Sequence, residues 1–174
     1  MKVGFIGLGN VGSKLAKNLI NNNFSLCVLD LNTSLSSSYL KMGAEWAKNP
    51  KELSISCDVI ITCLPSPQAC SAVMEGSNGV IEGLSERKIW LEMSTTDFEE
   101  VRRIGELVTS ANGQPMDCPV SGGCHRAATG NISIFAGGER KTFERALPVL
   151  KTLGRQILHT GELGLSLIHI SEPT

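Results

Sequence analysis

The chain has 174 residues, of which 41% are hydrophobic and 19% charged, and its formal net charge is −1. This length suits one domain with a sizeable core. The near-neutral charge does not favour a nucleic-acid or membrane-surface partner, and no apolar run approaches the roughly 20 residues of a transmembrane helix. The chain enters a strand-like segment at once and lacks the layout of a signal peptide, so we expect a cytoplasmic protein.

The N-terminal segment carries the strongest motif. Residues 3–6 form a short apolar run that is typical of a buried parallel strand. Glycines with the spacing G-x-G-x-x-G follow, and apolar residues then recur at helical spacing. A second apolar run, residues 24–29, ends in Asp30. Strand, glycine turn, helix, strand and acid in this order predict a dinucleotide-binding unit.

Each residue type in this unit has a physical role. Gly7 permits a tight turn, Gly9 lets the backbone approach a pyrophosphate, and Gly12 lets the helix pack closely on the strand. The N–H groups of the helix N-terminus favour phosphate. The predicted cofactor-binding residues of this loop are Gly7, Leu8, Gly9, Asn10, Val11 and Gly12.

The acid at the end of the second strand indicates which dinucleotide binds. The Asp30 carboxylate can accept hydrogen bonds from both ribose hydroxyls, and it would repel a 2′-phosphate. No arginine follows it directly, so the sequence favours NAD over NADP. A flavin remains open as an alternative, because FAD proteins use the same first unit.

Helical and strand-like segments alternate along the next part of the chain. Thr33 or Ser34 can cap the first of these helices, and Gly43 ends it. The expected strands are residues 44–47, 58–64 and 88–92. The expected helices are residues 34–42, 50–55, 67–74 and 98–108, the last with an inward face of Phe98, Val101, Ile104, Leu107 and Val108.

The same alternation continues to the end of the chain. We expect strands at residues 114–118, 131–136 (near a sheet edge) and 156–159, with a helix at 139–153 that Gly154 ends. This pattern predicts an α/β fold, a Rossmann-type doubly wound, mostly parallel sheet with helices on both faces. Ligands of such sheets bind beyond the carboxyl ends of the strands. The candidate strand ends are residues 7–12, 30, 64–66 and 93–95.

The six cysteines do not indicate a metal site. None forms a C-x-x-C pair, and the spacings match no zinc signature. Several lie in or beside apolar runs, so we expect buried thiols, with Cys118 and Cys124 the more exposed.

Four stretches in a fixed order point to a family. They are GFIGLGNVGSKLAKNL, ITCLPSP, LEMSTTD and MDCPVSGGCHRAATGNISIFAGG. Together they resemble the β-hydroxyacid dehydrogenases, in particular 3-hydroxyisobutyrate dehydrogenase and its tartronate-semialdehyde and glyoxylate reductase relatives. The resemblance covers residues 1 to about 164.

The resemblance implies roles for particular residues. The glycine loop and Asp30 would hold NAD, while Leu64, Pro65 and Thr95 would line its nicotinamide half. The turn formed by Ser121, Gly122 and Gly123 would bind the carboxylate of a small hydroxy or oxo acid.

Two residues beyond this turn need separate interpretation. Many relatives have a small residue at the position of Arg126. This arginine either contacts a second carboxylate or phosphate or lies in solvent, and the sequence favours the second alternative. The family does not use a histidine at the position of His125 for acid–base chemistry, so we assign it no role.

The end of the chain departs from the family. The relatives continue into a long helix that carries the acid–base lysine, followed by a helical domain that forms the dimer. No lysine occurs here after Lys151, and residues 165–174, LSLIHISEPT, resemble a translated sequencing adapter and lack the expected helical face. We therefore expect an NAD(P)-binding domain at residues 1–164, a non-native tail at 165–174, and no helical domain.

The expected parent activity is NAD-dependent oxidation of a 3-hydroxy acid to a semialdehyde, or the reverse reduction of a small oxo acid, by a homo-oligomer. The present chain would bind cofactor with little turnover, because it lacks the lysine. Two alternatives stay open: an NADPH-linked reductase of the tartronate-semialdehyde or glyoxylate type, and a non-catalytic NAD-binding sensor or interaction domain.

Overall fold

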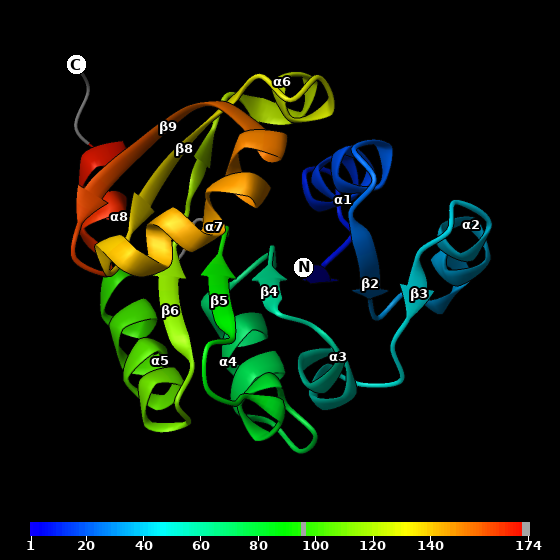
Figure 1. The fold of residues 1–174 in the computed structure, drawn as a ribbon, viewed down its shortest axis with the longest axis horizontal. Helices are drawn as coiled ribbons and strands as arrows, with labels where there is room; N and C mark the ends of the chain where they lie inside the picture. Colours follow the sequence, from blue (N-terminus) through cyan, green and yellow to red (C-terminus); the bar gives the residue numbers. More distant parts are fainter. Residues whose placement is uncertain (95–96, 172–174) are drawn as a thin grey trace.

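The computed structural model describes residues 1–94 and 97–171, with side chains through residue 168. Within these residues the chain forms a nine-stranded sheet with helices on both faces (Figure 1). The strands are β1 (Lys2–Ile6), β2 (Ser25–Leu29), β3 (Glu45–Trp46), β4 (Val59–Thr62), β5 (Ile89–Glu92), β6 (Gln114–Asp117), β7 (Val120–Ser121), β8 (Ile132–Gly137) and β9 (Gly154–Gly161). The helices are α1 (Gly12–Asn21), α2 (Ser36–Lys41), α3 (Pro50–Ser56), α4 (Pro67–Glu75), α5 (Phe98–Ser110), α6 (Gly123–Ala128), α7 (Arg140–Leu153) and α8 (Leu165–Ser171).

The topology confirms the predicted fold class. The sheet order is β3-β2-β1-β4-β5-β6-β8-β7, with β9 paired to β8, and the strands from β3 to β6 are all parallel. The chain therefore winds outward from β1 in one direction and returns beside it as β4. This reversal between β1 and β4 is where doubly wound sheets bind ligands.

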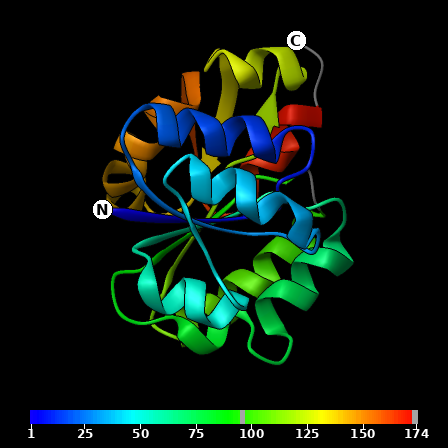
Figure 2. The same ribbon diagram turned by 90° about the vertical axis from the view of Figure 1, so that its right-hand side faces the viewer.

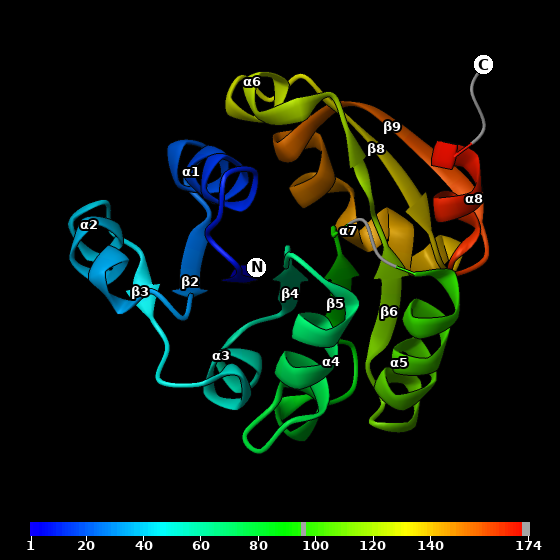
Figure 3. The ribbon, with the colours of Figure 1, turned by 180° about the vertical axis from the view of Figure 1, so that it is seen from behind.

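Two apolar cores lie on opposite faces of the sheet. Strand residues alternate between them, so that Val3 and Phe5 belong to one core and Ile6 to the other. Helices α1, α2, α6 and α7 pack on the first face, and α3, α4 and α5 on the second. Figure 2 shows α1 in blue above the edge-on sheet and α4 and α5 in green below it, and Figure 3 shows the second face from the front.

Local capping explains where several helices begin. The Asn49 and Ser66 side chains accept hydrogen bonds from backbone N–H groups at the starts of α3 and α4, and each is followed by a proline. The helical segment after β2 is capped differently from the prediction. Asn32, rather than Thr33 or Ser34, accepts the Ser34 N–H at 3.2 Å, because an Asn side chain readily bonds the backbone N–H two residues further on in an Asx turn.

Strand β8 lies near the edge of the sheet, as expected, because only the terminal strands β7 and β9 lie beyond it. Two other expectations were wrong in detail. Leu107 is exposed on α5, since Gly105 and Val108 take the inward positions. Cys118 is fully buried, because it directly follows the central strand β6.

The glycine-rich stretch after β6 and the C-terminal segment contain structure that the sequence did not predict. Residues expected to form a loop include the two-residue strand β7 and the short helix α6. Residues 165–171 form helix α8, which packs against β8 and β9, whereas the sequence showed no helical face there. That residues 165–174 are foreign to the domain stays a prediction. In the described part of the chain, no helix is long and apolar enough to cross a membrane.

Candidate functional site: a cleft at the sheet's switch point

The glycine loop connects β1 to α1 at the switch point. Gly7 has a φ of +102°, and a Cβ there would lie 2.2 Å from the Cys63 carbonyl oxygen. A Cβ on Gly12 would lie 2.0 Å from the Gly7 carbonyl oxygen, so the helix can approach the turn only without a side chain. These contacts agree with the tight turn and close helix packing predicted for the two glycines.

The middle of the loop is open on the cleft side. A Cβ on Gly9 would meet no heavy atom within 4 Å. Helix α1 has no side-chain hydrogen bond at its N-cap, Val11, and no acidic residue in its first turn. The Ser13 and Lys14 N–H groups donate to the backbone carbonyls of Gly9 and Val11. The Gly12 N–H at the helix start is therefore the group left for an anionic ligand, and the space at Gly9 lets a pyrophosphate approach it.

Asp30 is tied to the glycine loop by its own carboxylate. Its Oδ2 accepts the Leu8 N–H at 2.7 Å, and its Oδ1 accepts the Asn32 N–H at 2.8 Å. Leu8 does not line the cleft, but its backbone fixes the acid beside the loop. The next residue, Leu31, is exposed and lines the cleft. No basic side chain therefore directly follows Asp30 to attract a 2′-phosphate.

The loops after β4 and β5 complete the middle of the cleft. The Leu64 N–H donates to Ser94 Oγ at 2.7 Å, so the two loops are joined where they leave the sheet. The Ser94 N–H in turn donates to Glu92 Oε1 at 2.7 Å. Thr95, predicted to line the nicotinamide half, lies outside the described residues.

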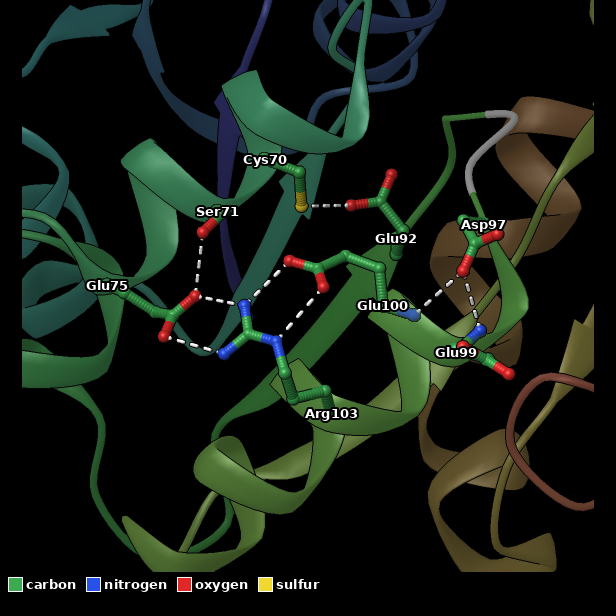
Figure 4. A network of polar contacts seen from close by, with 8 residues as sticks. All are labelled: Cys70, Ser71, Glu75, Glu92, Asp97, Glu99, Glu100 and Arg103. Carbon is green, nitrogen blue, oxygen red and sulfur yellow. Dashed lines mark hydrogen bonds and ion pairs between the residues drawn. The ribbon is translucent and has the colours of Figure 1, made fainter.

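Glu92 is a buried acid beneath these loops. Its Oε2 accepts hydrogen bonds from Thr62 Oγ1 and Cys70 Sγ, both at 2.8 Å, and Figure 4 shows the contact with Cys70. Burial raises the pKa of the Glu92 carboxyl, against the opposing effect of its hydrogen bonds with Cys70, Ser94 and Thr62. Burial and the neighbouring Glu92 raise the pKa of the Cys70 thiol, which keeps it protonated as a donor.

These strand ends open into one large cleft of about 1220 Å³. This exceeds the roughly 300–1000 Å³ of ordinary small-ligand pockets, as a dinucleotide requires. The predicted residues that line it are Gly7, Gly9, Asn10, Val11, Gly12, Asp30, Leu64, Pro65 and Gly123. One continuous cavity therefore connects the glycine loop with the loops predicted for the nicotinamide.

The Ser-Gly-Gly turn lies only partly at this cleft. Gly123 lines it, whereas Ser121 and Gly122 do not. Gly122 and Gly123 have φ values of +133° and +73°, both in the region that favours glycine, and the first is rarely adopted by any other residue. His125 and Arg126 are exposed on α6, and they line a separate, smaller pocket.

The sequence did not indicate two parts of the site. One is the wall formed by residues 46–50 and by Ala69, Ala72 and Val73 of α4, which carry no motif. The other is the support from Glu92. The sequence signal that could have predicted this support is the position of Glu92 at the end of an otherwise apolar strand. A carboxylate is rarely buried there unless it has hydrogen-bond partners.

The fold and the cleft together define a Rossmann-type dinucleotide-binding domain. Residues 2–161 match the family described as the NAD binding domain of 6-phosphogluconate dehydrogenase. The chain belongs to this family of NAD-binding domains.

Individual relatives agree with this assignment. The chain is 34% identical over 162 residues to a probable mitochondrial 3-hydroxyisobutyrate dehydrogenase of Dictyostelium discoideum, covering 93% of this chain and 50% of the relative. It is 33% identical over 164 residues to glyoxylate/succinic semialdehyde reductase 1 of Arabidopsis thaliana, covering 94% of this chain and 57% of the relative.

A solved structure is similar over nearly the whole chain. The Mycobacterium tuberculosis 3-hydroxyisobutyrate dehydrogenase with L-serine superposes with a TM-score of 0.89 at 27% identity, covering 97% of this chain and 57% of that one. The chain thus spans about half the length of the curated dehydrogenase and reductase relatives it matches.

Proposed function

We propose that this chain binds the coenzyme of an NAD-dependent 3-hydroxy acid dehydrogenase of the 3-hydroxyisobutyrate type. The observation that carries the proposal is the cleft itself, in which the open backbone at Gly9 and the loop-bound carboxylate of Asp30 lie at the same switch point. The first suits a pyrophosphate and the second suits a ribose with free hydroxyls.

The other loops suit the reacting half of the coenzyme. Leu64 and Pro65 would pack against the nicotinamide, with Thr95 proposed beside them. Ser121, Gly122 and Gly123 would orient the substrate carboxylate by neutral donors. When bound, NAD would supply the hydride acceptor for the carbinol carbon of the hydroxy acid, and a base would have to take the proton of its hydroxyl.

The base of this reaction is not among the residues assigned here. In the family that the sequence resembles, a lysine after this region serves as the base, and no lysine follows Lys151. Since acid–base help is typically worth about 10²–10⁴-fold, we expect NADH formation from 3-hydroxyisobutyrate by this chain to be at least that much slower than by a version extended with a family helical domain. Comparable rates would contradict this part of the proposal.

Binding of the coenzyme is tested by calorimetric titration with NADH and NADPH. We expect the wild-type chain to bind NADH more tightly than NADPH. Asp30→Asn keeps an acceptor for one backbone N–H but removes the charge, so NADH affinity should fall about tenfold or more and the preference over NADPH should shrink. Asp58→Asn is the matched control, because Asp58 accepts the Lys2 N–H at the opposite end of β1. Tighter binding of NADPH by the wild type would contradict the NAD assignment.

A reductase is the second candidate, because the Arabidopsis relative carries a reductase name. It would use the same cleft in the reverse direction, with hydride passing to an aldehyde or oxo acid. NADPH preference together with faster reduction than oxidation in the extended version would favour this candidate. Coenzyme binding without turnover in either direction would favour a non-catalytic sensor.

A further inference from the structure

A second pocket lies outside the cofactor cleft, between α6 and the strands β8 and β9. It has a volume of about 500 Å³. His125 and Arg126 of α6 form one side of it, and Arg155 at the start of β9 forms another. Ser133 and Gln156 lie between them on the sheet. Residues 29 positions apart in the sequence, Arg126 and Arg155, thus meet in one pocket.

The charge of this pocket is uncompensated. Its lining contains two arginines and no aspartate or glutamate. Among the residues that the structure describes, neither Arg126 nor Arg155 has a side-chain hydrogen bond or an ion pair. Two like charges in a shared pocket repel each other, and an anion between them would relieve that repulsion.

The floor of the pocket is polar and already ordered. Ser133 Oγ donates to Gln156 Oε1 at 3.1 Å across β8 and β9. On the other side of β8, Ser121 is the direct register partner of Ser133. Paired residues of neighbouring strands project from the same face of a sheet. The Ser121 side chain therefore lies on the pocket's side of the sheet.

Arg126 is packed on the turn that follows Ser121. A Cβ on Gly122 would lie 2.8 Å from Arg126 Cδ, so the stem of the arginine crosses this glycine. This nearness places the pocket directly beside the Ser-Gly-Gly turn.

We propose that this pocket is an oxoanion subsite that binds the second acidic group of the substrate. This inference rests on the proposed function, in which the Ser-Gly-Gly turn holds the first carboxylate. A guanidinium presents paired N–H donors to a carboxylate or phosphate, and two of them select an anion over a neutral group. Among the 3-hydroxy acids of the proposed function, this favours a substrate with an anionic group at each end over 3-hydroxyisobutyrate, which carries only one.

Anion titrations of the 174-residue chain followed by amide NMR test the subsite. The probes are malonate with two carboxylates, propionate with one, and inorganic phosphate. We expect malonate to bind at least tenfold more tightly than propionate and to shift the signals of Ser121, Gly122 and Ser133. Arg126→Gln and Arg155→Gln should each weaken malonate binding about tenfold. Arg140→Gln on α7 removes the same charge outside the pocket and should change nothing.

The remaining outcomes separate the sources of the anion and the two proposals. Malonate that binds no better than propionate, or equally well to the arginine variants, overturns the subsite. A third outcome is that the arginine variants lose phosphate binding while malonate binds no better than propionate. This outcome assigns the pocket to free phosphate and also overturns the substrate subsite. NADH titration of the same samples reports on the proposed function separately, and all three variants should bind NADH as the wild type does.

Discussion

At the scale of single residues, the three glycines of the loop differ in how much space surrounds them. Gly7 and Gly12 have no room for a side chain, because a Cβ would contact backbone oxygens. Gly9 has room, and its missing side chain matters only to a ligand. The distinction predicts that folding and binding can be separated by substitution.

Gly12→Ala should destabilise the chain, whereas Gly9→Ala should not. Overpacking at Gly12 should lower the free energy of unfolding by about 1–3 kcal/mol. Gly9→Ala should leave it within about 0.5 kcal/mol of the wild type but weaken NADH binding at least about tenfold, since the methyl occupies the path of the pyrophosphate. Urea unfolding and calorimetric titration measure the two effects. Loss of stability in Gly9→Ala would contradict this assignment.

Glu92 acts through the hydrogen bonds that its carboxylate accepts from neighbouring residues. Thr62 Oγ1 and Cys70 Sγ donate to its Oε2, and the Ser94 N–H donates to its Oε1. Ser94 Oγ in turn accepts the Leu64 N–H, so Glu92 is connected to the Leu64 loop. The carboxylate thereby holds together the ends of β4 and β5, although it lies beneath the cleft and is itself fully buried. We regard it as a positioning residue for the cofactor loops.

Glu92→Gln should lower both stability and coenzyme affinity. The amide nitrogen would replace one acceptor by a donor, and leaving buried donors unpaired should cost about 1–3 kcal/mol of unfolding free energy. NADH binding should weaken because the Leu64 loop is less well held. Glu86→Gln, the same change on an exposed loop, is the control. Unchanged NADH affinity in a folded Glu92→Gln variant would show that the loop does not depend on Glu92.

At the scale of elements, α5 shows how a capping side chain fixes where a helix begins. Asp97 Oδ1 accepts the Glu99 and Glu100 N–H groups at 2.9 and 3.1 Å at the start of α5, as Figure 4 shows. The same figure shows Arg103 of α5 between Glu100 and Glu75 of α4, which joins the two helices. Arg103 holds the pKa of the Glu75 carboxyl down at about 2. These side chains are partly exposed, so this ion pair contributes little to stability.

The cap of α5 should matter more than this ion pair. Asp97→Ala removes the acceptor for two N–H groups and should lower the unfolding free energy by about 1 kcal/mol. Glu99→Ala in the same first turn removes a charge without removing the cap. It should lower the unfolding free energy by only a few tenths of a kcal/mol. Chemical denaturation compares the two. An equal loss in both variants would indicate a charge effect in place of capping.

At the scale of the whole molecule, one buried acid connects the sheet to the C-terminal helix. Asp117 ends β6 and is fully buried, and its Oδ1 accepts the Gly164 N–H at 2.6 Å just before α8. In the described residues its Oδ2 has no hydrogen-bond partner. Burial raises the pKa of Asp117 to about 6, with a further contribution from Glu92, its register partner on β5.

This pKa predicts a dependence of stability on pH. Because the folded state holds the proton more tightly than the unfolded state, the stabilisation is complete below about pH 4 and is lost as the pH rises through about 6. The pKa difference corresponds to at most roughly 3 kcal/mol. Asp117→Asn keeps an acceptor for Gly164 and cannot ionise. Its stability relative to the wild type should therefore rise between pH 4 and pH 7, as measured by urea unfolding. A constant difference would contradict the raised pKa.

The sequence by itself determined the alternation of strands and helices, the glycine turn and its acid, because these depend on local periodicity and on residues adjacent in the chain. Only the tertiary structure decided which side chains meet across the sheet. Glu92 beneath the Leu64 loop, Asp117 against Gly164, and Arg126 beside Arg155 each join segments that sequence spacing does not relate. Those neighbours follow from the register of the strands and from which face each residue occupies, and a one-residue shift in register would reverse the face.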